Sequence, residues 1–201
     1  MTAKELFEQV KPLWEKYDLT KAEPYLKGLS DGSRNDILNK QEVGYYQFLP
    51  CLIEYLNPKI CLELGGAMGA ASLMMLSSLP KESRLYSITL AEQGLEFSFV
   101  KEKYPNFVPI VGNDLDLNNW PNDLDLNQTD LWFFDSEHNY DQLKAEYNLY
   151  KPFFKKGTVI LIDDIKINTE MYRAWLEFEC DKFDASVYLH WSGFGIAIWD
   201  K

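Results

Sequence analysis

Carboxylate side chains follow two apolar runs of the sequence, at the point where each run ends. Asp135 follows residues 131–134, and Asp163 and Asp164 follow residues 158–162. Each run has the length of a buried strand, and α/β proteins bind ligands at the carboxyl ends of parallel strands. Three carboxylates at adjacent strand ends would repel one another unless protons or a cation neutralised them. A divalent cation with oxygen ligands explains all three, whereas a helix cap or a solvated loop acid explains any one alone.

His138 comes three residues after Asp135 and is one of two histidines in the chain, the other being His190. An imidazole beside a divalent cation can accept a proton near neutral pH, as a transfer to a hydroxyl oxygen requires. The alternative is a solvated side chain at the start of a helix. Its position beside the carboxylates makes His138 the candidate general base, with Asp135 as the second catalytic residue.

A third apolar run, residues 60–64, leads into a glycine-rich turn. Gly65 and Gly69 let the backbone approach a ligand closely, and the helix that follows offers its N-terminal amides to a negative group. Glu63 would repel a pyrophosphate, and the spacing of the turn is not the Gly-x-Gly-x-x-Gly pattern of dinucleotide sites. The turn therefore favours a cofactor with a cationic amino-acid end, although tight packing alone also explains such a turn.

Two further strand ends could contribute to a cofactor site. Asp114 follows a strand expected at 107–111 and could accept a hydrogen bond from an adenine amino group, or be an ordinary turn acid. Thr89 follows a strand expected at 84–88, where nucleotide-binding sheets usually place an acid for the ribose. The complete set of expected cofactor contacts is Glu63, Gly65, Gly66, Gly69, Ser72, Thr89, Asn113, Asp114 and Asp135.

The elements that must position these residues alternate along the chain. Helices are expected between most of the strands, which is the pattern of a parallel sheet covered on both faces. Ser192 and Gly193 are expected to join two antiparallel strands of a terminal hairpin. The expected strands are 60–64, 84–88, 107–111, 130–134, 158–162, 186–191 and 194–199, and two long helices are expected at about 36–56 and 169–181.

The N-terminal residues predict an amphipathic helix over 4–17. Its apolar positions at helical spacing are Leu6, Val10, Leu13, Trp14 and Tyr17. Packing on the core is the simplest role for this helix, and a lid over the active site or a dimer contact is the alternative. A linker-like stretch at 27–33 follows it. We therefore expect a helical arm and linker over 1–34 and a main domain over 35–201.

The charge composition limits the classes of partner. Twenty basic and 31 acidic residues give a net charge of −11, which disfavours nucleic acid and anionic lipid. No segment approaches the ~20 apolar residues of a membrane span and no secretion signal is evident, which predicts a cytoplasmic protein. Cys51, Cys61 and Cys180 lack Cys-x-x-Cys spacing, which predicts reduced thiols.

In this order, the segments resemble the class I S-adenosylmethionine-dependent methyltransferases. Residues 63–69, Glu-Leu-Gly-Gly-Ala-Met-Gly, are similar to that family's first motif, Glu-x-Gly-x-x-x-Gly. Residues 134–140 and 156–164 resemble two acidic motifs of the metal-dependent O-methyltransferases related to catechol and macrolide-sugar methyltransferases. Cephalosporin-hydroxylase-like proteins share these two motifs. The resemblance covers about residues 36–200. It departs from the family pattern at Ala67, at Ser136 in place of glycine, and at Thr89 in place of the ribose acid.

The resemblance implies a Rossmann-like, doubly wound α/β fold with a seven-stranded, mostly parallel sheet and a C-terminal antiparallel hairpin. It also implies S-adenosyl-L-methionine as cofactor, Asp135, Asp163 and Asp164 as ligands of Mg²⁺ or a similar ion, and His138 as general base. The expected reaction is methyl transfer to a hydroxyl of a small molecule, with the ion lowering the pKa of the acceptor.

Two other functions stay open. One is a catalytically weak or inactive regulatory protein that binds the same cofactor, for which Thr89 is the clue. The other is an NAD-linked oxidoreductase, which Glu63 and the glycine spacing disfavour. The N-terminal arm is the expected contact of any homo-oligomer.

Overall fold

The computed structural model describes residues 1–27, 29–90 and 103–201. In these residues a seven-stranded sheet has the order β3-β2-β1-β4-β5-β7-β6. Strands β1 to β5 pair in parallel, and β7 runs antiparallel to both β5 and β6. The predicted mostly parallel, Rossmann-like sheet is therefore confirmed. The strands are β1 (Ile60–Leu64), β2 (Arg84–Thr89), β3 (Phe107–Val111), β4 (Leu131–Phe134), β5 (Val159–Asp163), β6 (Asp181–Asp184) and β7 (Phe194–Ile198).

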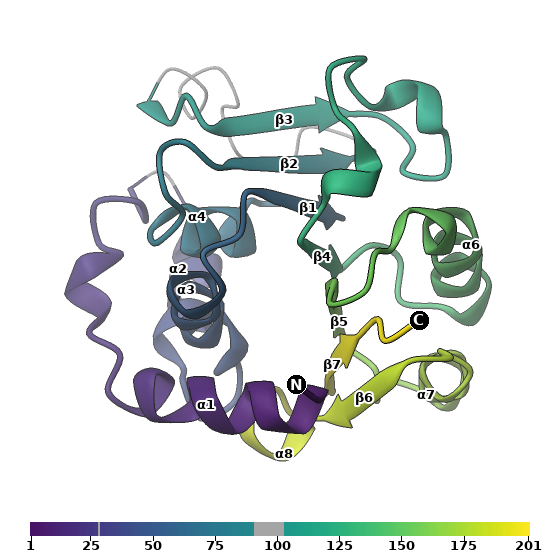
Figure 1. Cartoon of the computed structure of the whole chain (residues 1–201). Coiled ribbons are helices and arrows are strands. Elements are labelled where there is room, and N and C mark those ends of the chain that lie inside the picture. The colour runs from purple at the N-terminus through teal and green to yellow at the C-terminus, as the bar shows by residue number, and fades with distance from the viewer. Residues whose placement is uncertain (28, 91–102) are drawn as a thin grey trace.

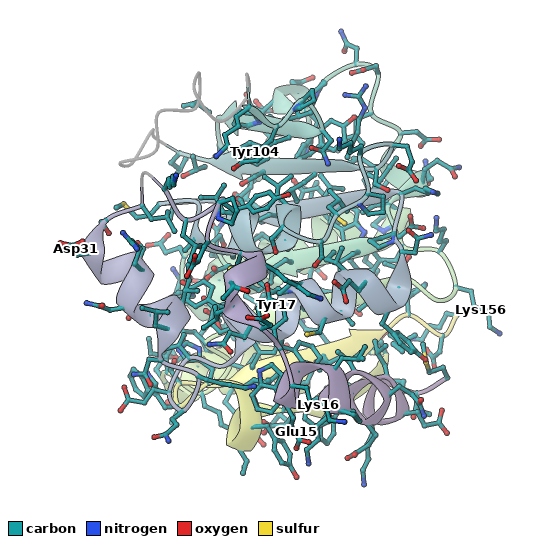
Figure 2. The ribbon with its side chains drawn as sticks, turned by 90° about the vertical axis from the view of Figure 1, so that its left-hand side faces the viewer. Glu15, Lys16, Tyr17, Asp31, Tyr104 and Lys156 are labelled. Carbon is teal, nitrogen blue, oxygen red and sulfur yellow. The ribbon has the colours of Figure 1, made fainter. Side chains whose placement is uncertain are left out.

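Helices cover both faces of the sheet (Figure 1). One layer consists of α1 (Ala3–Glu15), α2 (Asp31–Leu38), α3 (Tyr45–Leu56) and α4 (Ala70–Leu76). The other face carries α6 (Tyr140–Tyr150) and α7 (Thr169–Leu176), and the short α8 (Ser186–Leu189) lies near α1. Figure 2 looks onto the first layer and places Tyr17, from the segment after α1, over its middle.

Each strand buries side chains on both faces because both faces are covered. In β4, Leu131 and Phe133 pack with the α1–α4 layer, while Trp132 and Phe134 pack with residues of α6 and α7. This double burial explains why the strands are continuous apolar runs in the sequence rather than alternating ones.

The strand register brings the predicted site residues to one edge of the sheet. Leu64 of β1 pairs with Phe134 of β4, and Phe134 pairs with Ile162 of β5. Gly65, Asp135 and Asp163 each follow one of these residues. The three therefore lie side by side at the carboxyl ends of adjacent parallel strands, where ligand sites of this architecture form.

The prediction for the C-terminal segment is partly wrong. The helix expected to reach residue 181 ends at Leu176, and residues 181–184 form β6. Residues 186–189, expected as the first hairpin strand, form α8 within the β6–β7 connection. A single turn of helix is too short for its apolar period to be distinguished from strand alternation. The last strand, β7, is antiparallel as expected, but its partners are β5 and β6 and not residues 186–191. Gly193 has φ of +111° and lies between α8 and β7, so it does not join the two antiparallel strands directly.

The helix predicted over 36–56 is two helices. Ser30 caps α2 by accepting a hydrogen bond from the amide of Ser33, so helix begins within the stretch expected to be a linker. The break before α3 lies at Gly44, whose carbonyl accepts a hydrogen bond of 2.9 Å from the Trp14 indole. A Cβ at Gly44 would lie 2.9 Å from the Trp14 ring, so a glycine permits this close contact.

The predicted N-terminal helix is present as α1, and its packing is now defined. Leu6 and Val10 are fully buried and Trp14 nearly so, as the spacing predicted. Leu13 is instead 44% exposed, while Phe7, which the spacing did not single out, is fully buried. These buried side chains belong to the same core as the inner face of the sheet. The division into an arm and a main domain at residue 34 stays a prediction.

Two predictions from composition can be compared with the structure. Cys51, Cys61 and Cys180 are free, with the first two buried. Within the described residues, no helix combines the length and apolarity needed to cross a membrane.

Candidate active site

Three carboxylates and two imidazoles form one cluster at the carboxyl ends of β4 and β5. His138 lies between two of the acids, with Nε2 3.3 Å from Asp135 Oδ1 and Nδ1 3.0 Å from Asp164 Oδ2. His190 Nδ1 is 2.8 Å from Asp163 Oδ1 and 3.5 Å from Asp164 Oδ1. The structure thus brings together the four residues that the sequence proposed for metal binding and proton transfer, and adds His190.

Burial and mutual repulsion make this cluster retain protons. Burial raises the pKa of Asp135 well above its ordinary value, and the charge of Asp163 raises it further, against the opposing effect of His138. Burial also lowers the pKa of His138, but the hydrogen bond to Asp135 and the surrounding carboxylates outweigh it and raise that pKa to about 9. With no cation bound, His138 is therefore an imidazolium at neutral pH. A divalent cation at these carboxylates would compete with its proton.

The segment 190–193 is held against the acids by the backbone of 164–166. Asp164 has a left-handed backbone, with φ of 56°, and its carboxylate accepts a hydrogen bond from Ser192 Oγ. Lys166 N donates to the Ser192 carbonyl at 2.7 Å. A Cβ at Gly193 would lie 2.4 Å from Lys166 N, so the turn needs a glycine. Sequence reasoning noted His190 but missed its role, because its contacts come from this tertiary docking.

The glycine turn after β1 is built on the end of β4. Gly65 has φ of +95°, and a Cβ there would lie 1.9 Å from the carbonyl oxygen of Asp135. Gly69 has φ of +76° and is the N-cap of α4. Ala67 also has a positive φ, of 34°. The turn therefore permits close packing of two strand ends, in addition to any approach by a ligand.

This packing defines a test at Gly65. Gly65→Val should abolish cofactor binding and also lower the free energy of unfolding, because the side chain would displace the Asp135 backbone. Gly157→Ala is the matched control: its φ is +91°, but a Cβ there meets nothing within 4 Å. Gly157→Ala should lower the free energy of unfolding by about 1–2 kcal/mol, because alanine is strained in the left-handed conformation. Urea unfolding and calorimetry with S-adenosylhomocysteine would measure both effects, and wild-type affinity in folded Gly65→Val would contradict the placement of the cofactor.

Glu63 lies beneath the glycine turn and is 1% exposed. Its carboxylate accepts a hydrogen bond from Ser72 Oγ, which lies 3.3 Å from Ser87 Oγ. Burial raises the pKa of Glu63, while the hydrogen bonds from Ser72 and Ser87 oppose that rise. Ser72, expected as a cofactor contact, is fully buried and contacts Glu63.

Two adjoining cavities meet at this edge of the sheet. One, of about 510 Å³, brings together the predicted residues Gly65, Thr89, Asn113, Asp114 and Asp135. The second, of about 410 Å³, contains Asp135 and the predicted base, together with Asp163 and His190. Gly66, Gly69 and Glu63 line a smaller cavity of about 200 Å³ on the other side of the turn, again with Gly65 and Asp135. Each of these three cavities therefore reaches Asp135.

A buried polar network supports Asp114 in the first of these cavities. Gln142 Nε2 donates to Asp114 Oδ1 at 3.0 Å and to Glu146 Oε1 at 2.9 Å. Ser136 Oγ also donates to Glu146, which is 1% exposed. Tyr150 Oη donates to the Asp114 carbonyl, which fixes the backbone of that residue. Sequence reasoning missed Gln142 and Glu146, because polar residues on a helix usually face solvent.

Glu146 gives the stability a pH dependence of defined sign. Burial raises its pKa well above the ordinary value, and Asp114 raises it further. The folded protein therefore retains a proton that the unfolded chain releases above about pH 4.3. Stability from this group is complete below that pH and falls as the pH rises towards the folded pKa, by at most about 1.4 kcal/mol per pH unit.

Glu146→Gln should flatten this dependence, since an amide can donate to Asp114 and accept from Ser136 and Gln142. Urea unfolding at several values from about pH 5 to 8 would measure the slope. Glu8→Gln, at an exposed position of α1, is the control and should keep the wild-type slope. Equal slopes in wild type and Glu146→Gln would show that Glu146 is ionised in the folded protein.

Fold and site together define an α/β protein with a nucleotide-type cavity beside a carboxylate–histidine centre. Residues 62–165 match a family described as a methyltransferase domain. The chain belongs to this family, and the resemblance seen in its sequence is confirmed. Comparison with curated protein sequences finds no match.

Solved structures with this fold are similar to the chain over most of its length. A Staphylococcus aureus protein described as a caffeoyl-CoA O-methyltransferase is 18% identical, with 90% of this chain and 100% of that chain covered and a TM-score of 0.64. An O-methyltransferase from Bacillus cereus in complex with S-adenosylhomocysteine is 16% identical, over 90% and 91% of the two chains, with a TM-score of 0.62. An S-adenosylhomocysteine-bound methyltransferase from Podospora anserina is 14% identical, over 98% and 96%, with a TM-score of 0.64.

Proposed function

We propose that this protein transfers a methyl group from S-adenosyl-L-methionine to a hydroxyl of a small molecule, with a divalent cation at Asp135, Asp163 and Asp164. The observation that carries the proposal is the meeting of two cavities at Asp135, one lined by the predicted cofactor residues and one by the carboxylate–histidine cluster. Methyl donor and acceptor would then occupy neighbouring cavities. Family membership and the S-adenosylhomocysteine bound in two similar structures support the choice of cofactor.

The residues of the first cavity fit this cofactor. Its volume of about 510 Å³ lies within the range of small-molecule sites. The Asp114 carboxylate can accept from an adenine amino group, and Thr89 can offer a hydroxyl to the ribose. Gly65 and Asp135 also line this cavity, and their main-chain groups could bind the amino-acid part.

The carboxylate–histidine cluster fits a divalent cation. Two groups of three side chains, Asp135–His138–Asp163 and Asp163–Asp164–His190, each place their ligand atoms within 4.8 Å of one another. Carboxylate oxygens suit Mg²⁺, and an added imidazole suits Mn²⁺ or another transition metal. When bound, such an ion would supply positive charge that lowers the pKa of the acceptor hydroxyl.

The protein residues then have defined roles in the transfer. The bond between sulfur and the methyl carbon breaks, a bond between the acceptor oxygen and that carbon forms, and the hydroxyl proton must leave. His138 lies at the second cavity and can take this proton once it is neutral, since its imidazolium form cannot accept one. Asp135 orients His138 through the contact at 3.3 Å. The cavities supply the alignment of donor and acceptor.

Calorimetry and a transfer assay test the proposal. We expect S-adenosylhomocysteine to bind and NAD not to bind, and labelled methyl groups to appear on one or more members of a hydroxyl-compound panel in the presence of Mg²⁺ or Mn²⁺. Binding without transfer to any member would favour the second candidate, a regulatory protein, for which Thr89 in place of an acid is the supporting feature. Binding of NAD instead would overturn both.

A further inference from the structure

The second cavity has an acidic and aromatic lining. Its volume is about 410 Å³, and besides the carboxylate–histidine cluster it is lined by Asp36 and Val43, by Tyr45 and Tyr46, and by Trp191. Over residues 1–27, 29–90 and 103–201, no lysine or arginine side chain lines it. Lys166, two residues after Asp164, instead pairs with Asp184 at 2.6 Å.

Asp36 is the acid of this lining that contacts neither histidine of the carboxylate–histidine cluster. The carboxylates of Asp135 and Asp163 contact histidines, and a bound cation would neutralise them further. Asp36 lies on α2, is exposed, and forms no ion pair with any residue that the structure describes. Its carboxylate therefore has no basic partner among the described residues and can pair with a ligand that fills the cavity.

Aromatic rings form the rest of the wall. Burial raises the pKa of Tyr45 and of Tyr46, and the nearby acids Asp163 and Asp135 raise them further, so both hydroxyls stay neutral. Trp191 is 72% exposed, while its amide is anchored by a hydrogen bond of 3.2 Å to the Glu42 carbonyl. An aromatic face at the rim of an acidic cavity attracts a cation or a flat ring.

We propose that the methyl acceptor is a small ring-bearing hydroxyl compound with a positively charged substituent, which Asp36 and the Trp191 ring recognise. This inference rests on the proposed function. An acceptor linked to coenzyme A carries phosphates, and a carboxylate acceptor carries one negative charge. Both would be repelled by Asp36 and would find no lysine or arginine in the described lining to bind them. The acceptor class thus differs from the caffeoyl-CoA named for the similar Staphylococcus aureus structure.

Three vicinal dihydroxybenzenes that differ in charge test this proposal. They are 3,4-dihydroxyphenethylamine, which is cationic, neutral 4-methylcatechol and anionic 3,4-dihydroxyphenylacetate. Calorimetric binding in the presence of S-adenosylhomocysteine and Mg²⁺ is measured alongside kcat/KM for methyl transfer. We expect both affinity and kcat/KM to be highest for the cationic compound, lower for the neutral one and lowest for the anionic one. The cationic and anionic compounds should differ by about tenfold or more at low salt.

Asp36→Asn should reduce the preference for the cation over the neutral compound by about five- to tenfold. Asp31→Asn is the matched control, since Asp31 lies on the same helix at the outer edge of the molecule and lines neither cavity (Figure 2). It should leave the charge order unchanged. Trp191→Leu should weaken binding of all three rings and of the cation most.

Several outcomes would overturn the inference. They are equal binding of the three compounds, preference for the anion, no binding of any of them, or loss of S-adenosylhomocysteine affinity in Asp36→Asn with the charge order intact. The last result would place Asp36 in the cofactor site. Binding in the expected order without methyl transfer would support the inference on charge while contradicting the proposed reaction.

Discussion

Mg²⁺ or Mn²⁺ should raise the melting temperature of the metal-free protein, and Asp163→Ala should abolish that rise together with methyl transfer. Asp163 belongs to both groups of side chains that could hold an ion, so no other single substitution removes as much of the site. At a metal concentration a hundredfold above Kd the stabilisation is about 2.7 kcal/mol. For a domain of this size that corresponds to about 5–10 °C. Thermal melts with and without EDTA measure it.

The controls separate metal binding from catalysis. Asp123→Asn, at an exposed position, should keep the full metal response. His138→Ala should keep much of the response, since Asp163, Asp164 and His190 remain, but lose turnover because the proton acceptor is gone. If the wild-type melting temperature does not change with Mg²⁺, Mn²⁺ or Ca²⁺, the cation site is wrong. The three carboxylates would then be neutralised by His138, by His190 and by protons that the buried acids retain.

The sequence predicted those site residues whose positions depend on the pairing of the strands. Asp135 and Asp163 end apolar runs, and adjacent parallel strands bring their carboxyl ends together without further information. His138 could also be placed near the carboxylates, because it comes only three residues after Asp135 and before α6 begins. His190 and Ser192 could not be placed in the same way, since their contacts depend on how the turn at Gly193 docks against Ile165 and Lys166.

Buried polar residues on helices show a second limit. Glu146 and Gln142 lie on α6, where Leu143, Tyr147 and Tyr150 are buried at helical spacing. Glu146 lies on the same helical face, but the spacing does not show what neutralises it, because its partners Ser136 and Asp114 come from two different strand ends. A charged residue in the middle of an apolar helical face is the only available signal.

Periodicity has a similar limit at α1, where the expected apolar face omits Phe7 and includes Leu13. The helix contacts α3, β6 and β7 at once, so its buried face is wider than a single stripe. Phe7 packs between the rings of Phe48, Phe183 and Tyr188, at centroid distances of 5.8, 5.1 and 5.0 Å. These partners come from α3, β6 and α8, so the side chain joins three elements.

Phe7→Ala should therefore lower the free energy of unfolding by about 3–5 kcal/mol, the usual cost of truncating a fully buried phenylalanine. This is a large share of the about 5–15 kcal/mol that stabilises a typical domain. Leu13→Ala, on the exposed side of the same helix, should cost about 1 kcal/mol or less. Urea unfolding of the two variants compares the truncation of a buried apolar side chain with that of an exposed one on the same helix.

Deleting residues 1–27 should by the same reasoning unfold the protein, because it removes Leu6, Phe7, Val10 and Trp14 from the core at once. Far-UV circular dichroism and a denaturant titration of the truncated chain measure this outcome. A truncated protein that unfolds cooperatively and binds S-adenosylhomocysteine within a few fold of wild type would contradict it. In that case α1 would be an accessory arm whose burial adds little to the free energy of unfolding. Its contribution would then be sought in the binding of the methyl acceptor.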